Sequence, residues 1–179
     1  MIITPREFLR AFEKTIAQNT GALVSNWLSN STYTSLWKKP GSGIYFQLAD
    51  KMGLSAISEY WSLDAVFFKT LDKTIHNGNY AKNLWVVMEH ENSGRDSIQE
   101  MNKLSIIDSP LKVLVTYAES EGERQSLLGK YKEILSESDT FGDLGSQRKH
   151  LVVFGELKGD VIKWHPRLFN GTGFSAIGG

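Results

Sequence analysis

Three acidic residues interrupt two otherwise apolar segments of this chain. Asp64 lies between Leu63 and the apolar run that follows it, and Glu89 and Glu91 close the apolar run of residues 84–91. Residues two apart on a strand project from the same face, so Glu89 and Glu91 are expected to lie on one face. A carboxylate in a buried strand costs free energy unless a cation or a hydrogen-bond donor compensates it. This pattern favours a cation site.

The chemistry of these acids points to a divalent metal ion. If the strands that contain Asp64 and Glu89 pair, their carboxylates converge, raise each other's pKa values and bind a divalent cation readily. The chain has no cysteine, and oxygen ligands without thiols favour Mg²⁺ or Mn²⁺ over zinc. Such an ion polarises a phosphodiester and activates a water molecule for in-line attack. The expected reaction is therefore metal-assisted phosphodiester hydrolysis.

Each of these residues also has a plainer interpretation. Asp64 and Glu89 could be structural acids at strand ends that pair with lysines, and Glu91 could be an exposed residue that begins a turn. The side chain of His90 is expected to point to the opposite face and to form an ordinary hydrogen bond. Most of the five tryptophans suit a hydrophobic core, although Trp61, close to Asp64, could instead stack on a base.

The first third of the chain is expected to be helical. Residues 4–7, Thr-Pro-Arg-Glu, form a capping box with proline at the first helical position. Apolar residues at helical spacing follow, and we expect this helix to end at residues 19–21. Three further helices are expected at residues 23–28, 33–37 and 44–52.

After Gly53 the pattern changes to strands that alternate with helices. Strands are expected at residues 56–60, 63–68, 84–91, 111–117, 150–157 and 161–164, and helices at residues 96–107 and 123–135. The first two strands are close enough to form an antiparallel hairpin, and residues 84–117 predict a parallel strand–helix–strand unit. The sequence therefore predicts an α/β fold with a mixed central β-sheet flanked by helices.

The order of these elements and acids resembles the PD-(D/E)xK, or restriction-endonuclease-like, nuclease superfamily. Asp64 is followed twenty-five residues later by Glu89-x-Glu91 at a strand end, then by a helix and another strand. The resemblance implies a core of a helix, three strands, a helix and a strand (αβββαβ) over residues 44–117. It also implies Asp64 and Glu89 as ligands of Mg²⁺ or Mn²⁺, with the backbone carbonyl of His90 as a further ligand.

One position departs from the pattern of this superfamily. The third motif position usually holds lysine and here holds Glu91. Some members have glutamate there, and others take the lysine from the following helix. The resemblance then implies Lys103 as the lysine, with Gln99 one turn earlier on the same face. Glu59, at the end of an earlier strand, and Gln99 are candidates for contacts just outside the ligand set.

Two functions follow from these residues. The first is a Mg²⁺- or Mn²⁺-dependent endonuclease that hydrolyses DNA in restriction or repair, with Asp64, Glu89, Glu91 and Lys103 as the catalytic set. A homodimer would let such an enzyme cut both strands. The second is a catalytically inactive module of the same fold that binds nucleic acid or protein. The retained acids favour the first function, and the missing motif lysine and the zero net charge favour the second.

Length and composition limit the remaining alternatives. With 179 residues the chain suits a single domain: a helical segment (1–43), the nuclease-like core (44–117), a helix and β-hairpin (118–169), and a loose glycine-rich tail (170–179). The sequence has no Walker or Rossmann glycine loop and no Gly-x-Ser-x-Gly motif. It also shows no signal peptide and no apolar run of roughly 18 residues, so the cytoplasm is the expected location.

Overall fold

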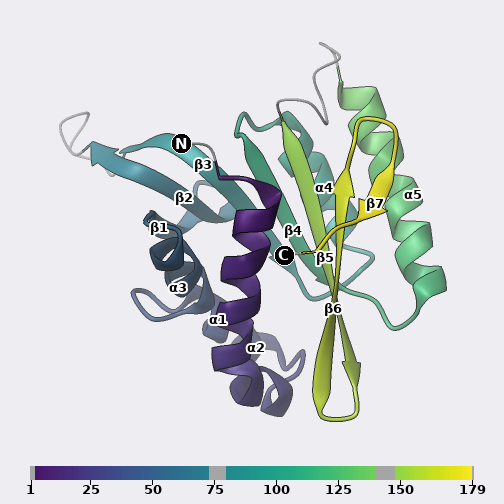
Figure 1. Cartoon of the computed structure of the whole chain (residues 1–179), viewed down its shortest axis with the longest axis horizontal. Coiled ribbons are helices and arrows are strands. Elements are labelled where there is room, and N and C mark those ends of the chain that lie inside the picture. The colour runs from purple at the N-terminus through teal and green to yellow at the C-terminus, as the bar shows by residue number, and fades with distance from the viewer. Residues whose placement is uncertain (1–2, 73–79, 140–147, 179) are drawn as a thin grey trace.

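A computed structural model describes residues 3–72, 80–139 and 148–178 of the chain. In these residues it has five helices and one seven-stranded mixed sheet, so the predicted α/β class is confirmed (Figure 1). The helices are α1 (Pro5–Ser25), α2 (Asn30–Lys38), α3 (Ile44–Lys51), α4 (Ser97–Ile106) and α5 (Glu121–Ser138). None of these described helices combines the length and the hydrophobicity that a membrane span needs.

The strands follow one another across the sheet in the order of the chain. They are β1 (Ser55–Tyr60), β2 (Leu63–Asp72), β3 (Tyr80–Glu91), β4 (Leu111–Tyr117), β5 (Lys149–Lys158), β6 (Val161–Phe169) and β7 (Phe174–Ala176). The pairs β1–β2 and β2–β3 are antiparallel, β3–β4 and β4–β5 are parallel, and β5–β6 and β6–β7 are antiparallel. The predicted hairpin and the predicted parallel unit are therefore both present.

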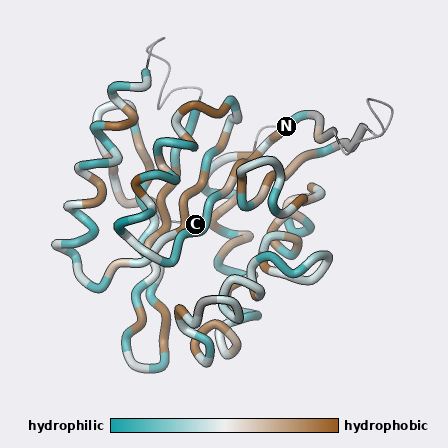
Figure 2. Tube along the Cα trace, turned by 180° about the vertical axis from the view of Figure 1, so that it is seen from behind, coloured by the Kyte–Doolittle hydropathy of each residue, from teal (hydrophilic) through white to brown (hydrophobic). Residues whose placement is uncertain are grey.

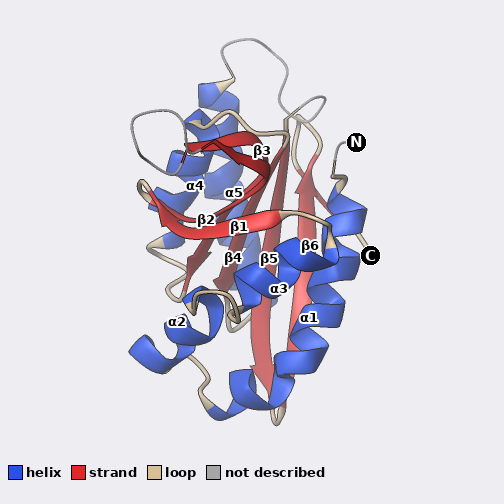
Figure 3. Ribbon diagram, turned by 90° about the vertical axis from the view of Figure 1, so that its left-hand side faces the viewer, coloured by secondary structure: helices blue, strands red, loops and turns tan. Residues whose placement is uncertain are grey.

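Helices cover both faces of the sheet (Figures 1 and 3). The helices α1, α2 and α3 pack on one face, and α4 and α5 pack on the other. Alternate residues of β3 enter the two cores: Val86 and Met88 face the first group of helices, and Val87 faces the second. Every residue of β4 is buried, as expected of a central parallel strand. Figure 2 shows that the outer helix α5 alternates between hydrophilic and hydrophobic residues, so one side faces the core.

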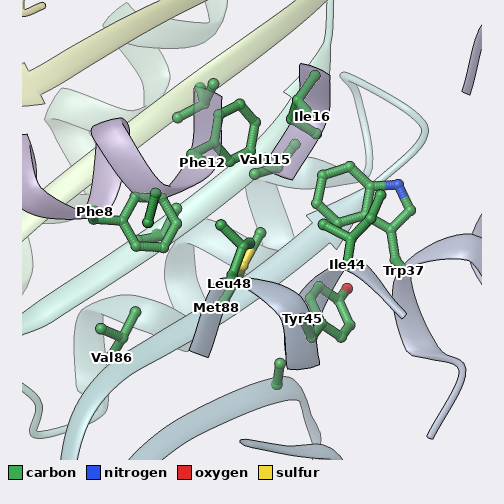
Figure 4. Packing of buried hydrophobic residues seen from close by; sticks show 14 of the residues in the cluster. Phe8, Phe12, Ile16, Trp37, Ile44, Tyr45, Leu48, Val86, Met88 and Val115 are labelled. Carbon is green, nitrogen blue, oxygen red and sulfur yellow. The ribbon is translucent and has the colours of Figure 1, made fainter. Parts of the chain in front are cut away.

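The core on the α1–α3 face is rich in aromatic side chains. Trp37 from α2 is fully buried there, and its ring lies 6.4 Å from that of Phe12 and 5.8 Å from that of Tyr45. Figure 4 shows the side chains that meet in this core, among them Phe8, Phe12, Ile16, Trp37, Ile44, Tyr45, Leu48, Val86, Met88 and Val115. This packing fixes the position of α2, which is short, relative to the sheet.

The N-terminal helix begins as predicted but is longer than predicted. The capping box is present, with the Glu7 amide donating to Thr4 Oγ1 and the Thr4 amide donating to Glu7 Oε2. The helix does not end at residues 19–21 but continues to Ser25, where it buries Leu23, and the side chains of Asn19 and Thr20 donate to carbonyls of the preceding turn. The separate helix expected at residues 23–28 is therefore wrong, since residues 23–25 belong to α1.

The end of the chain is more ordered than its composition suggests. Residues 174–176 form β7, which pairs with β6, so the expectation that residues 170–179 are loose is wrong for this segment. The ring of Phe174 lies 5.2 Å from that of Phe169 and packs against the core on the α4–α5 face. The open edge of β6 offers unpaired backbone groups, and the tail pairs with them.

Candidate active site

The two predicted acids of β2 and β3 lie where the pairing of these strands ends. The last paired residues before them are Ala65 and Met88. Beyond this pair the Asp64 amide donates to Glu89 Oε2 at 3.2 Å, and the His90 amide donates to Asp64 Oδ2 at 2.9 Å. Each carboxylate therefore accepts a backbone N–H of the neighbouring strand. The acids converge, as their positions on adjacent strands predict.

A lysine from α4 completes one side of this site. Lys103 Nζ lies 2.9 Å from Glu89 Oε1 and also forms an ion pair with Glu100 of its own helix. The same ammonium donates to the carbonyl oxygen of Ser62 at 2.9 Å. Lys103 thus brings α4 against Glu89 and against the turn between β1 and β2.

A second lysine, which the sequence did not single out, lies on the other side. Lys38, the last residue of α2, has its Nζ 2.9 Å from Asp64 Oδ1 and 3.4 Å from Glu59 Oε1. Burial tends to lower the pKa of Lys38, but the bonds to Asp64 and Glu59 outweigh burial, so its pKa is raised and it stays charged. Lys38 and Lys103 therefore each face one acid. Among the described residues, Glu59 is connected to the site by its ion pair with Lys38.

Glu89 is more deeply buried than the other charged groups of the site. Its side chain is 1% exposed, whereas the side chains of Asp64, Lys38 and Lys103 are 20%, 25% and 28% exposed. Burial raises the pKa of Glu89 to about 8, the negative charges of Asp64 and Glu100 act in the same direction, and the hydrogen bond from Lys103 opposes them. A divalent cation bound to Glu89 would offset the cost of burying its negative charge and would lower its pKa.

This raised pKa predicts how stability depends on pH. Because the folded protein holds a proton on Glu89 that the unfolded chain releases near the usual value of 4.5, the free energy of unfolding should fall as pH rises from 4.5 to about 8. The contribution of this one group is at most about 1.4 kcal/mol per pH unit. Denaturant unfolding of the wild type and of Glu89→Gln at several pH values measures it, since the variant lacks the titrating group. Equal pH dependence in the two proteins would contradict the prediction.

The His90 ring lies on the opposite face from Glu89, as predicted. It stacks on Trp37 with ring centroids 4.2 Å apart, and its Nε2 is 2.7 Å from the hydroxyl of Tyr117, which donates to the hydroxyl of Tyr33. Burial lowers the pKa of His90 to about 3, so the ring is neutral. Its role is to hold α2, and with it Lys38, against the sheet. The backbone carbonyl of His90 stays a predicted metal ligand.

Two predicted residues lie outside this constellation. Glu91 is half-buried and accepts a hydrogen bond from the Ser93 amide at 2.8 Å, which matches its interpretation as a turn residue. Gln99 is exposed on α4. Within residues 3–72, 80–139 and 148–178, neither side chain forms a hydrogen bond or an ion pair with Asp64, Glu89 or Lys103. The structure therefore assembles Asp64, Glu89 and Lys103 without Glu91 and Gln99.

The donor set suits magnesium better than a metal that requires a full protein cage. In the described part of the chain no three acids or histidines cluster as metal ligands would. Mg²⁺, however, usually keeps several waters and is held by one or two carboxylates together with substrate phosphates. Asp64 and Glu89 lie at neighbouring strand ends and Glu89 is deeply buried, but each carboxyl group is 2.9 Å from a lysine ammonium, with which a Mg²⁺ ion would have to compete.

A scan against models of protein families finds no match to this chain, and a search of curated proteins finds no match either. The function must therefore be inferred from the geometry of the site.

Proposed function

We propose that this protein is a Mg²⁺- or Mn²⁺-dependent endonuclease that hydrolyses DNA phosphodiester bonds on a restriction-endonuclease-like core. The supporting observation is that Asp64 from β2, Glu89 from β3 and Lys103 from α4 meet where the pairing of β2 and β3 ends. The order of α3, β1, β2, β3, α4 and β4, with β3 and β4 parallel, is the αβββαβ order that the resemblance implies.

The residues of the chain divide the work of this reaction. Asp64 and Glu89 would hold the metal ion, which when bound polarises the phosphodiester and activates water. Glu89 must lose its proton before it can act as a ligand, so metal binding and proton release are coupled. Lys103, 2.9 Å from Glu89, would stabilise the negative charge that develops on the phosphate oxygens. Lys38 would orient Asp64.

One observation favours a second candidate, the inactive module that binds nucleic acid or protein. Each carboxylate is already paired with an ammonium, Asp64 with Lys38 and Glu89 with Lys103, at 2.9 Å in both cases. Each carboxyl group therefore already has a lysine partner without a metal ion. Under this alternative the four side chains fasten α2 and α4 to the ends of β2 and β3.

Metal-dependent nicking of DNA distinguishes the two candidates. The purified protein is incubated with supercoiled plasmid in Mg²⁺, in Mn²⁺ and in EDTA, and its thermal unfolding is recorded with and without Mn²⁺. The endonuclease should nick the plasmid only with metal, and Mn²⁺ at about 100 times its Kd should raise the Tm by about 5–10 °C. A monomer would release nicked circles, whereas a homodimer that cuts both strands would release linear DNA. If the protein shows neither cleavage nor a Tm shift, that result would contradict the endonuclease and support the binding module.

A further inference from the structure

An exposed tryptophan lies at the tip of the β1–β2 hairpin, beside the candidate active site. Trp61 is 87% exposed, more than any other large hydrophobic side chain in the described residues. Tyr60 pairs with Leu63, so Trp61 and Ser62 form a two-residue turn, and the φ of Trp61 is +59°. Such a backbone conformation is unfavourable for a bulky residue, and glycine or asparagine would suit it better. Neither the turn nor the core accounts for a tryptophan here.

An apolar groove runs next to this tryptophan. It has a volume of about 290 Å³, and its lining includes Trp61, Tyr60, Leu63, Leu84 and Ile107. None of the described residues that line it is charged. The Trp61 and Tyr60 rings are stacked at a centroid distance of 6.2 Å and an angle of 29°. The groove therefore offers flat aromatic surface that is open to solvent.

A single lysine connects the groove to the acids. The carbonyl of Ser62, which lines the groove, accepts the hydrogen bond from Lys103 Nζ, and that same ammonium is 2.9 Å from Glu89 Oε1. The turn is thus held directly against the residue that would contact a phosphate. An apolar aromatic surface and a cationic group side by side match the two parts of a nucleotide, its flat base and its anionic phosphate.

We propose that this groove binds an unpaired nucleobase adjacent to the phosphate at Lys103, so that the preferred substrate is single-stranded DNA or DNA with an unpaired segment. The inference rests on the proposed function, because it takes the phosphate position from the candidate active site. A base inside a duplex is stacked on its neighbours and cannot reach a protein ring, whereas an unpaired base presents its π face. Every base has such a face, so the groove would select unpaired structure and not sequence.

Binding of oligonucleotides in EDTA tests this inference without any cleavage. Binding is measured by the fluorescence anisotropy of a dye-labelled single-stranded oligothymidine and of a labelled blunt duplex of equal length, and tryptophan emission is recorded in the same titrations. The single strand should quench the emission, and Trp61→Ala should weaken its binding by about 5- to 100-fold. Trp61→Phe should keep most of the affinity while losing the quenching, since phenylalanine still stacks. Ile106→Ala is the matched control, because Ile106 is also exposed, at 76%, but does not line the groove.

Several results would overturn the base site. The first is equal affinity of the wild type and Trp61→Ala for the single strand. The second is that Ile106→Ala weakens binding as much as Trp61→Ala does. The third is that the duplex quenches the emission as much as the single strand does. Loss of self-association in Trp61→Ala, without any change in DNA binding, would overturn it in favour of contact with a second copy. Failure of the proposed function looks different: no metal then supports cleavage of the single strand or nicking of the plasmid, while the Trp61-dependent binding of the single strand in EDTA persists. Nicking without that binding contradicts the base site alone.

Discussion

Replacing Glu89 with glutamine is expected to reduce metal-dependent nicking of supercoiled plasmid by at least about 100-fold, to the level seen in EDTA. Glutamine has nearly the same size and its side-chain oxygen can still accept the Asp64 amide, which is bonded to Glu89 at 3.2 Å. It cannot supply the negative charge that a divalent cation requires. The fold should persist while the activity disappears, because Lys103 keeps its ion pair with Glu100 when Glu89 is replaced.

Two comparisons make this result specific. Glu121→Gln is the matched control, since it changes an exposed acid of α5 whose partners in the described residues are Arg124, Gln125 and Arg167 and not Asp64, Glu89 or Lys103. Nicking by this variant should stay within a few-fold of wild type. Far-UV circular dichroism and thermal unfolding establish that both variants fold. Folded Glu89→Gln that still nicks within tenfold of wild type would refute Glu89 as a metal ligand.

The largest effect on stability is expected from Trp37→Ala, which should lower the free energy of unfolding by about 3–5 kcal/mol. The Trp37 side chain is fully buried, stacks on His90 at 4.2 Å and fills the space between α2 and the sheet. Alanine would leave a cavity there, and a typical domain has only about 5–15 kcal/mol of stability in total. The midpoint of urea unfolding measures this loss.

The chain provides its own control for this experiment. Trp61→Ala removes the same side chain from a site that is 87% exposed, and it should change the free energy of unfolding by less than about 0.5 kcal/mol. The contrast between the two variants isolates burial from residue type. Similar unfolding midpoints for Trp37→Ala and Trp61→Ala would show that α2 contributes little to the stability of the fold. Trp37→Ala should also weaken nicking, because Lys38 follows it in α2 and contacts Asp64.

The central strands of the sheet could be predicted from the sequence because they contain apolar runs bounded by turn residues. The strand that contains Glu89 and the fully buried β4 both lie within a few residues of their predicted bounds. The N-terminal helix was harder, since Asn19, Thr20 and Gly21 resemble helix-ending residues, yet the helix continues past them and buries Leu23 in the core. The short strand β7 depends on an available edge of β6, which no local pattern reveals.

The candidate site shows the same division between local and long-range information. Asp64 and Glu89 were identifiable because acids in apolar strands are unusual. Lys103 could be named only through the superfamily resemblance. Lys38 lacked any signal, since it follows the short helix expected at residues 33–37 and meets Asp64 only when α2 packs on the sheet. Glu91 was expected beside Glu89 from its spacing, but β3 ends at Glu91, which bonds to the turn that follows.

The bonds that Asp64 and Glu89 make to backbone amides have a consequence for the descent of this protein. Each acid closes the gap between β2 and β3 by accepting an N–H of the other strand, so each is under selection for folding as well as for any chemistry. A descendant that had lost its activity would still be expected to keep both acids. Trp61 does not contribute to folding in a comparable way, because it is exposed at a turn that glycine or asparagine would suit better. Among homologues, persistence of an aromatic residue at this position would therefore report a working site more faithfully than persistence of the acids.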